Sequence, residues 1–396
     1  MEFYKLDNSS NIQNTLKLFQ SIGSDETGCK IISKKTKSHL LYIKNIHVGG
    51  ANILKQDALS IGADLLVPMG VIVAREKYVD VILVGTTKHF EILSRKELAQ
   101  PFGLKELAKE LQSFVNTKTY PTKIMGIINA NDDSFFEESR FSPKGTSSQA
   151  QGEYSDAIVA KVNSMIEDGA DIIDIGAVST RPGSEAVDEN EELMRVKPIC
   201  DLIKEKKLYE KTVFSIDSYT PSVIEYALKS GFTIVNDITG LANDEVSKIT
   251  AAYDATIVIM HMQGTPKNMQ QNPTYEDVMC EVDSFFKERI QKAKEFGIEK
   301  IILDVGIGFG KTLEHNLTLL KNMEHFRHFG YEVLIGASRK SLIEKVIPNT
   351  PTSQRLPATL TIHLDSVRKG ASIVRCHDVK EHSDAIKMQK SIDKSI

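Results

Sequence analysis

The chain has 396 residues, of which 41% are hydrophobic and 26% are charged, a balance that is typical of globular proteins and excludes disordered and fibrous classes. Its formal net charge of −4 argues against binding nucleic acid through bulk charge. The length fits either two domains or one large α/β barrel with an extension. The four cysteines lie far apart and form no CxxC pattern, so we predict neither a disulfide framework nor a zinc site, and we expect a reducing compartment.

The hydrophobicity pattern predicts no targeting or membrane segment. The first residues lack the apolar core of a secretory signal. The longest apolar stretch, residues 65–74, is about half as long as a membrane span and contains Pro68 and Gly70. We therefore interpret this stretch as buried sheet, and we expect a cytoplasmic protein that binds neither membranes nor nucleic acid.

The first 117 residues have strand and helix patterns of their own. No phosphate-binding loop, metal-ligand spacing or cluster of cations occurs among them. We predict a small α/β accessory domain over residues 1–117 whose role the pattern leaves open, followed by a polar, proline-containing linker at 116–122. The expected strands are 38–46, 70–74 and 79–84, and the expected helices are 53–61, 91–98 and 104–114.

A different rhythm begins at residue 118. Short β-branched runs recur roughly every 20 to 50 residues, separated by amphipathic helical patterns such as 156–168, 221–229 and 275–296. Strands that alternate with helices predict a parallel sheet. Eight such units over about 275 residues match the size of a (β/α)₈ barrel. A doubly wound open sheet is the alternative, but no GxGxxG follows the first strand, so we predict a (β/α)₈ barrel over residues 118–396.

Polar side chains follow all eight expected strands. Catalytic residues of a (β/α)₈ barrel lie at the carboxyl ends of its strands. One polar residue there can simply begin a loop, but eight strands that deliver polar groups to one rim favour an active site. These groups are Asn129, Asp174, Asp217, Asn236, Asp237, His261, Asp304, residues 338–340 and residues 375–378.

The cations among these groups favour an anionic, phosphorylated substrate. Lys340 directly follows a strand, Arg181 lies in a proline–glycine turn, and Arg375 and His377 end the last strand. The segment GIGFGKT has the composition of a phosphate-binding loop without its spacing. We therefore interpret its Lys311 as lining a pocket.

The carboxylates require hydrogen-bond donors. Asp174, Asp217 and Asp304 end strands flanked by apolar residues, so we expect each to be partly buried. A cation or the amidine-like edge of a flat heterocycle can satisfy them, and Asn236 offers such an edge both a donor and an acceptor. No spacing of His or Cys predicts a transition metal. Mg²⁺ held mainly by a substrate phosphate needs one protein oxygen, which Asn129 can give.

Eight sequence blocks occur in a fixed order between about residues 123 and 388: MGIINANDDSF, DIGAVSTRPGSE, FSIDSY, VNDITG, MHMQGTPKNMQ, ILDVGIGFGKTLEHN, GASRKSLI and VRCHDVKEH. Together they resemble the dihydropteroate synthase family of pterin-binding (β/α)₈ barrels. The resemblance implies a transferase that condenses 6-hydroxymethyl-7,8-dihydropterin pyrophosphate with para-aminobenzoate, releases pyrophosphate, uses Mg²⁺, forms a homodimer and is a sulfonamide target.

The resemblance also implies roles for individual residues. It assigns catalysis to Asp174, Asp217, Lys340, Arg375 and His377, and Mg²⁺ binding to Asn129. It places the pterin ring near Asp217, Asn236, Met260, Asp304, Phe309 and Lys340, the pyrophosphate near Arg375 and His377, and para-aminobenzoate near Thr180, Arg181, Pro182 and Ser341. Asp133, Ser134 and Phe135 fall in the family's first loop.

The departures from the family are local. The first loop reads Asn-Ala-Asn-Asp-Asp-Ser-Phe where the family has Asn-Val-Thr-Pro-Asp-Ser-Phe, and Val305 replaces the usual proline. Two alternatives stay open. One is a pterin-binding methyltransferase that serves a corrinoid, against which the SRKS and VRCHD segments argue. The other is a pterin-binding paralogue that has lost catalysis, whose support is the altered first loop.

Overall fold

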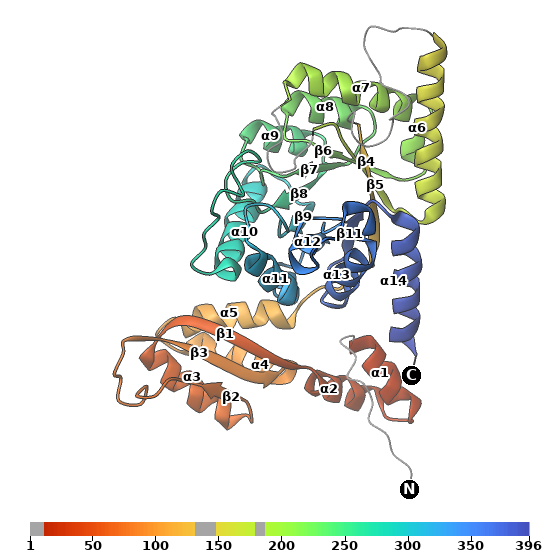
Figure 1. Cartoon of the computed structure of the whole chain (residues 1–396). Coiled ribbons are helices and arrows are strands. Elements are labelled where there is room, and N and C mark those ends of the chain that lie inside the picture. The colour runs from red at the N-terminus through yellow and green to blue at the C-terminus, as the bar shows by residue number, and fades with distance from the viewer. Residues whose placement is uncertain (1–11, 131–147, 179–186, 396) are drawn as a thin grey trace. The chain divides into compact units, whose positions relative to one another are not determined.

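A computed structural model describes residues 12–130, 148–178 and 187–395 of the chain. The chain divides into two compact units (Figure 1). The N-terminal unit comprises Met1–Lys118, Arg327–Gly330 and Lys390–Ile396, and the barrel unit comprises Thr119–Phe326 and Tyr331–Gln389.

The barrel unit contains a closed barrel of eight parallel strands in the order β10-β11-β4-β5-β6-β7-β8-β9. The predicted (β/α)₈ fold is thereby confirmed, because every predicted strand is present and helices surround the closed sheet (Figure 1). The strands are β4 (Lys123–Asn129), β5 (Ile172–Gly176), β6 (Val213–Asp217), β7 (Ile234–Asp237), β8 (Thr256–Met260), β9 (Ile301–Asp304), β10 (Glu332–Ile335) and β11 (Ile373–Cys376).

The outer helices start and stop where their sequences provide caps. Pro221 opens α8, and Gly231 follows its end with φ +100°, a conformation that favours glycine. Thr312 and His315 form a capping box at the start of α11. The helices are α6 (Ser148–Asp168), α7 (Glu189–Glu205), α8 (Pro221–Lys229), α9 (Asp244–Ala252), α10 (Val278–Glu295), α11 (Leu313–Lys321), α12 (Leu342–Val346), α13 (Leu356–Arg368) and α14 (Val379–Lys394).

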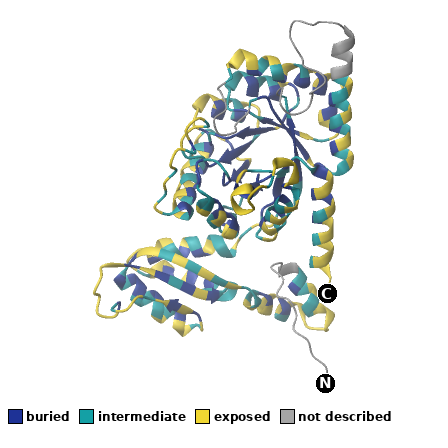
Figure 2. Cartoon of the chain, in the orientation of Figure 1, coloured by how far each residue is buried: buried dark blue, intermediate teal, exposed yellow. Residues whose placement is uncertain are grey.

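The barrel interior is filled by one layer of apolar side chains that positions the polar rim. This layer comprises Met125, Ile172, Ile234, Val258, Ile302, Leu334 and Ile373. Alternate residues of a strand face the same side of the sheet. Residues two positions further along the same strands therefore point the same way, one layer closer to the carboxyl ends. The barrel strands are mostly buried, and β5 and β7 are buried at every residue (Figure 2).

The N-terminal unit contains a three-stranded antiparallel sheet in the order β1-β3-β2, built from β1 (Ser38–His47), β2 (Asp64–Leu66) and β3 (Tyr78–Thr86). Its helices are α1 (Ile12–Ser21), α2 (Glu26–Thr36), α3 (Val48–Ser60), α4 (Thr87–Lys96) and α5 (Leu104–Val115). Its own apolar core gathers side chains such as Leu54, Leu83 and Leu93.

One strand predicted in this unit is wrong. Residues 70–74 form turns, and the strand lies earlier, over residues 64–66. Ile72 and Val73 are exposed, so this part of the apolar stretch is not buried sheet. The two helices α1 and α2 were not expected from the sequence pattern. The predicted strands 38–46 and 79–84 and the predicted helix 104–114 match β1, β3 and α5 closely.

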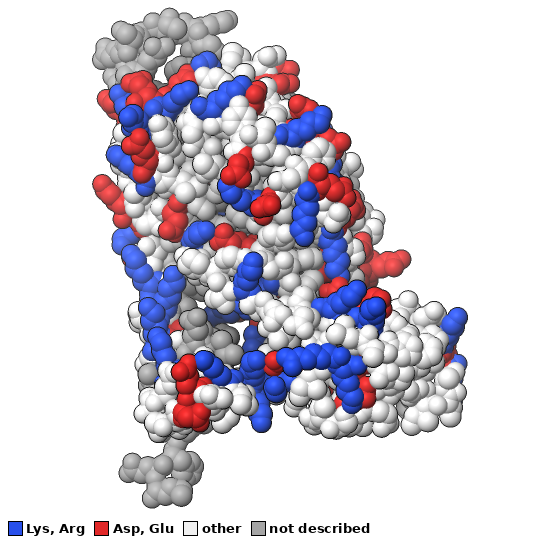
Figure 3. All heavy atoms as spheres, turned by 180° about the vertical axis from the view of Figure 1, so that it is seen from behind, with Lys and Arg blue, Asp and Glu red and all other residues white. Residues whose placement is uncertain are grey.

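Among the described residues, no helix is both long and apolar enough to cross a membrane. On the face drawn in Figure 3, acidic and basic side chains are interspersed over much of the surface.

Candidate active site

Polar side chains from several strands meet inside the carboxyl end of the barrel. Asp174, Asn236, Asp304 and Arg375 each lie two residues beyond a member of the apolar layer, so they face the same interior. Asp217 ends β6 and is paired in register with Asn236 of β7 and Gly176 of β5. A side chain on Gly176 would come within 3.2 Å of the Asp217 Cβ atom, so the glycine leaves room for this carboxylate.

Arg375 joins two of the carboxylates. Its Nε donates to Asp174 at 2.6 Å, and a terminal nitrogen donates to Asp217 at 2.7 Å. Asn236 donates to the same Asp174 oxygen at 3.1 Å. The neighbouring carboxylates outweigh burial and raise the pKa of Arg375, so it stays charged. The other oxygen of Asp174 is buried and has no hydrogen-bond partner among the described residues, so it can accept a bond from a ligand.

Asp217 is poised to change its charge near neutral pH. Burial raises the pKa of its carboxyl to about 7, the Arg375 guanidinium opposes this, and the Asp174 and Glu192 carboxylates add to it. Glu192 of α7 is itself buried and accepts hydrogen bonds from Ser218 and Thr220, both at 2.6 Å. Asp217 therefore offers a ligand a carboxyl whose proton is easily gained or lost.

Lys340 brings the second cation of the site. Burial lowers the pKa of its amine to about 8, while Asp304 favours the charged form. Its Nζ donates to the Ile307 carbonyl and lies 4.4 Å from the centre of the Phe309 ring. The pKa of Asp304 is raised by burial, and its carboxylate accepts from the Gly306 N–H at 2.8 Å. Lys340 thus connects β10 to the loop that follows β9.

The Lys311 side chain binds the backbone of that same loop, residues 306–311. Its Nζ donates to the carbonyls of Gly306 at 3.0 Å, Phe309 at 2.9 Å and His261 at 3.1 Å, and it lies 2.9 Å from His261 Nδ1. Burial lowers the pKa of Lys311 to about 7, and burial together with Lys311 lowers the pKa of His261 to about 2. The side chain predicted to line a pocket is therefore engaged with the backbone of its own loop.

The last strand end is held by contacts that the sequence pattern did not reveal. The Ser338 hydroxyl lies 2.8 Å from His377 Nδ1 and accepts from the His377 N–H at 3.3 Å. Arg339, with φ +56°, donates to Asp378. No local periodicity points to such pairs, because their partners lie 39 residues apart.

The remaining predicted residues are distributed as follows. Met260 is buried at the end of β8, Phe309 is half-buried, Ser341 is exposed and Asn129 is half-buried at the end of β4. Asn129 is paired in register with Gly176, which in turn is paired with Asp217, so it lies two strands away from Asp217. Thr180, Arg181, Pro182 and residues 133–135 lie outside the described residues.

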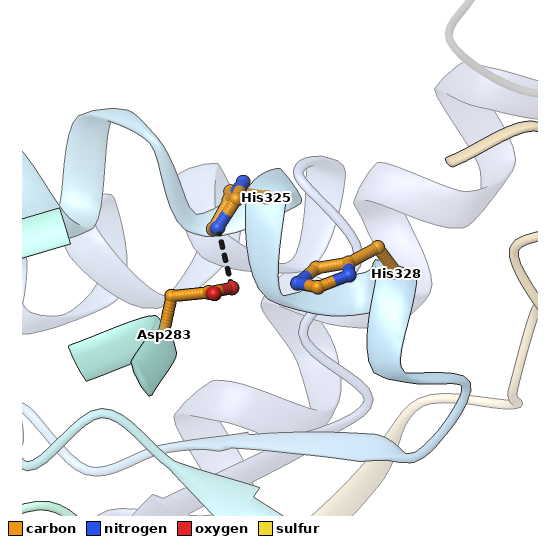
Figure 4. A group of neighbouring side chains, drawn as sticks. All are labelled: Asp283, His325 and His328. Carbon is orange, nitrogen blue, oxygen red and sulfur yellow. Dashed lines mark hydrogen bonds and ion pairs between the residues drawn. The ribbon is translucent and has the colours of Figure 1, made fainter. Parts of the chain in front are cut away.

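A separate Asp–His pair lies on outer elements of the barrel unit (Figure 4). His325, in the short helix η3 (Met323–Phe329), is 2.9 Å from a carboxylate oxygen of Asp283 in α10. His328, the third residue drawn, belongs to the N-terminal unit. The pair comes from helices rather than from strand ends, so it is separate from the polar side chains that meet inside the carboxyl end of the barrel.

Three carboxylates, one amide and two cations thus meet around the barrel axis, and we call this group the strand-end cluster. Its members are Asp174, Asp217, Asp304, Asn236, Arg375 and Lys340. Carboxylates and the amide suit the donor edge of a nitrogen heterocycle. Arg375 has further N–H donors beyond the two it gives to Asp174 and Asp217, and these suit an anion. The described site can therefore bind a polar heterocycle and an anionic group side by side.

Comparison with known proteins agrees with this geometry. Residues 125–377 match the family described as pterin binding enzyme. A bifunctional dihydropteroate synthase/dihydropteroate reductase of Helicobacter pylori is 38% identical over 389 residues, which cover 98% of this chain and 98% of that protein. Two solved structures cover 69% of this chain. The Yersinia pestis dihydropteroate synthase with a sulfonamide drug is 34% identical, has a TM-score of 0.61 and is covered over 95% of its length. The Clostridium difficile dihydropteroate synthase in the presence of pteroic acid is 38% identical, has a TM-score of 0.61 and is covered over 98%.

Proposed function

Because this chain belongs to the pterin binding enzyme family and is a dihydropteroate synthase by its similarity to that family's members, we propose that the strand-end cluster is the site of its reaction. The reaction condenses 6-hydroxymethyl-7,8-dihydropterin pyrophosphate with para-aminobenzoate to give 7,8-dihydropteroate and pyrophosphate. The chain is thus a transferase of folate biosynthesis. The observation that carries the assignment of the site is the convergence of three carboxylates on Arg375 and Lys340 within the matched region.

The pterin ring is proposed to occupy the carboxylate side of the cluster. The free oxygen of Asp174 and the carboxyl of Asp217 can accept bonds from the ring's amidine-like edge, and Asn236 can both donate and accept. Met260 and Phe309 are proposed to pack on the ring faces, as the family resemblance implies. Lys340 lies over Phe309 and is proposed to hydrogen-bond the ring from that side.

The pyrophosphate is proposed to lie against Arg375 and His377, with Mg²⁺. Asn129 offers one oxygen ligand at the end of β4, and the donor type fits a hard cation that keeps waters and phosphate oxygens as its other ligands. When bound, Mg²⁺ would neutralise charge on the leaving pyrophosphate. Arg375 and His377 add positive charge and N–H donors at the same place, and Ser338 orients the His377 ring.

Bond cleavage is proposed to separate charge rather than to use a protein nucleophile. The C–O bond to pyrophosphate breaks, the cations hold the leaving anion, and the resulting pterin cation is stabilised by its own ring electrons and by Asp174, Asp217 and Asp304. The amine of para-aminobenzoate then forms the new C–N bond and loses a proton. We propose that it approaches past Ser341 and the segment with Thr180, Arg181 and Pro182, where a sulfonamide would compete with it.

Pyrophosphate release by the full chain tests this function. Release should require both the pterin pyrophosphate and para-aminobenzoate, and sulfonamides should compete with para-aminobenzoate. Pterin binding without any release would instead support a paralogue without catalysis. Methyl transfer from methyl-tetrahydrofolate to a corrinoid would support the methyltransferase. We further propose a cytoplasmic homodimer: the family resemblance supports the dimer, and four cysteines without disulfides support the compartment.

A second activity is favoured by how far the similarity extends. The bifunctional Helicobacter pylori protein matches 98% of this chain, whereas the two solved synthases match only 69% although they are themselves covered almost completely. The extra length includes the N-terminal unit. We therefore propose that this chain also reduces dihydropteroate, with the N-terminal unit contributing to that step.

The reduction balances as the addition of a hydride and a proton across one C=N bond of the dihydropterin ring, giving tetrahydropteroate, while a reduced nicotinamide or flavin is oxidised. The test supplies the full chain with 7,8-dihydropteroate and NADH or NADPH, with and without added flavin mononucleotide. Consumption of the reductant that depends on dihydropteroate supports the activity. No consumption under any of these conditions contradicts it.

A further inference from the structure

Two buried histidines on outer helices of the barrel unit take no part in the proposed reaction. His363 belongs to α13 and His382 to α14, and each is 1% exposed (Figure 1). The ring centres lie 5.0 Å apart, and Nδ1 of His363 is 2.9 Å from Nε2 of His382. Burying an imidazole is costly unless its nitrogens have hydrogen-bond partners, so the outer contacts of this pair show what it holds.

The pair is bonded at both ends to backbone groups. The Ala337 N–H donates to His363 Nε2 at 3.0 Å, and His382 Nδ1 lies 2.6 Å from the Asp378 carbonyl oxygen. An N–H can only donate and a carbonyl can only accept, so the proton of each neutral ring is on Nδ1. The bonds therefore run in one direction, from Ala337 through His363 and His382 to Asp378.

Burial keeps both rings neutral. It lowers the pKa of His363 well below the ordinary 6.5, and the neighbouring His382 and Lys340 act in the same direction. Burial also lowers the pKa of His382, although the bond to the Asp378 carbonyl opposes this. A protonated His363 would present an N–H to the Ala337 N–H and lose that bond. The pair is therefore a fixed link with one arrangement of its protons.

The two ends of this link flank the Ser338–His377 pair. Ala337 directly precedes Ser338, and Asp378 directly follows His377. The Ser338 hydroxyl lies 2.8 Å from Nδ1 of His377, the residue proposed to bind pyrophosphate. A shift of either backbone would move one partner of this contact, and the His377 ring would move with it.

Helix α13 supports the backbone on both sides of Ser338. Besides His363, it contributes the Thr359 hydroxyl, which accepts from the Arg339 N–H at 3.1 Å. The two side chains are buried, and their spacing of four residues places them on one face of the helix. Arg339 has φ +56°, a conformation that residues other than glycine rarely adopt, so this segment depends on such support.

We propose that His363 and His382 are positioning residues for pyrophosphate binding. His363 holds the backbone next to Ser338, and Ser338 orients the His377 ring toward the pyrophosphate. His382 holds the backbone next to His377 and accepts the Nδ1 proton of His363, which leaves Nε2 of His363 as the acceptor for Ala337. This proposal rests on the proposed function, in which His377 binds the pyrophosphate.

The test compares the binding of two ligands to the full chain by calorimetry. Pterin pyrophosphate, titrated with Mg²⁺ present, carries the pyrophosphate, whereas pteroic acid carries the ring system without it. Loss of the positioning should weaken the first ligand and leave the second unchanged. A general loosening of the barrel would weaken both.

Three substitutions of His363 separate its two nitrogens. The Gln amide reaches the place of Nε2 and can accept from Ala337, the shorter Asn amide reaches only the place of Nδ1, and Leu has neither group. His363→Leu and His363→Asn should weaken pterin pyrophosphate about 10-fold, the scale of one hydrogen bond to a charged group. His363→Gln should stay within about 3-fold of the wild type, although like His363→Leu it lacks the bond to His382.

Two variants on the same helices control for stability. Ser366→Ala removes a buried hydroxyl of α13 that donates to the Ile362 carbonyl of its own helix. Ile386→Ala opens a cavity at a buried position of α14 and removes no polar group. Both should bind the two ligands as the wild type does, even where the melting temperature falls.

His382→Gln decides the question if the His363 variants do not fold. It keeps an acceptor for His363 but has no donor near the Asp378 carbonyl. Pterin pyrophosphate should then bind about 3-fold more weakly and pteroic acid as before. Unchanged affinity for both ligands would overturn the proposal.

The proton positions can be observed directly in the wild type. With ¹⁵N-labelled histidine, the NMR signals of both rings should be those of the neutral Nδ1–H form, and the variants at each position identify them by their loss. A proton on Nε2 of either ring would contradict the direction of the bonds and overturn the proposal.

The outcomes separate this proposal from the proposed function. If the wild type releases pyrophosphate and His363→Asn binds pterin pyrophosphate normally, the function stands and the positioning role falls. Equal losses for both ligands, or a loss in His363→Gln as large as in His363→Leu, would also overturn the role, because the histidines would then support only the fold. A loss confined to pterin pyrophosphate and restored by Gln, in a chain that never turns over, would keep the role and remove the reaction.

Discussion

The pKa of the buried Asp217 carboxyl is set by two opposing effects, burial and the ion pair with Arg375. Burial raises its pKa to about 7, while Arg375 pulls the pKa down through an ion pair. Without the arginine, the carboxyl would be a buried acid with little reason to ionise. With Arg375 present, the pKa of the Asp217 carboxyl lies near neutral pH. Hydrogen bonds from the donor edge of a bound ligand can therefore stabilise the charged form of the carboxyl, which only accepts hydrogen bonds.

Replacing Asp217 by asparagine should therefore weaken pterin binding. Asp217→Asn keeps the size but puts an NH₂ where a donor edge needs an acceptor, and Arg375 keeps its bond to Asp174. The affinity for pterin pyrophosphate should fall by about 2 kcal/mol or more, the scale of a hydrogen bond to a charged group. Calorimetric titration measures this loss. Asp365→Asn, an exposed change in α13, serves as the control, and equal affinity in both variants would remove Asp217 from the pocket.

At the scale of elements, Lys311 is a main support of the loop after β9, beside Lys340, which donates to the Ile307 carbonyl. Lys311 satisfies three carbonyls that belong to the loop and to His261. Lys311→Met keeps the length but leaves buried carbonyls unpaired, at a cost of about 1 to 3 kcal/mol for each group. We expect lower stability in urea together with a higher KM for pterin pyrophosphate, because Phe309 loses its support. Lost affinity at unchanged stability would mean that Lys311 contacts substrate directly.

In the N-terminal unit, a buried carboxyl between α3 and α5 should make stability depend on pH. Burial and the neighbouring Asp57 raise the pKa of Glu97 to about 7 from an ordinary 4.5. In that window the folded chain keeps a proton that the unfolded chain loses, so stability falls as the pH rises from 4.5 to 7. Glu97→Gln has no proton to lose.

The stability of Glu97→Gln relative to the wild type should therefore increase between pH 5 and pH 8, by about 2 kcal/mol. Scanning calorimetry of the full chain at both pH values measures it through the transition of the N-terminal unit. Glu106→Gln, an exposed change on α5, should show no such growth. A constant difference between the Glu97 variant and the wild type at the two pH values would show that Glu97 is ionised throughout.

Elements were predictable where burial and sequence pattern agree. Barrel strands such as β5 and β7 are buried on both faces, so their sequences are continuous β-branched runs. The polar residue that ends each run indicates where the rim of the barrel lies. The prediction of a strand over residues 70–74 was wrong because Ile72 and Val73 are exposed, although Val71 is buried, and composition alone does not distinguish an exposed apolar run from a buried one. Asp174, Asn236 and Arg375 could be predicted to meet from strand register. The loop contacts of Lys311 and the Ser338–His377 pair could not, because they depend on tertiary packing.

At the scale of the whole molecule, the division into two units predicts which activity survives truncation. The two solved dihydropteroate synthases match only 69% of this chain but are themselves covered over 95% and 98%, so we expect the barrel to carry the synthase reaction. In this chain the last residues, 390–396, belong to the N-terminal unit, and the Asn14 amide donates to the Asp393 carbonyl. Removing residues 1–117 leaves that segment without such partners, so some stability should be lost.

A chain that begins at Lys118 should therefore still release pyrophosphate, with a lower melting temperature, and should lose any reduction of dihydropteroate. Parallel assays of both reactions on the full and shortened chains measure this, with circular dichroism to confirm that the shortened chain is folded. A folded, pterin-binding barrel without pyrophosphate release would mean that residues 1–117 supply part of the synthase site, because every other group of the strand-end cluster is still present. Reduction that persists in the shortened chain would instead place the second activity in the barrel.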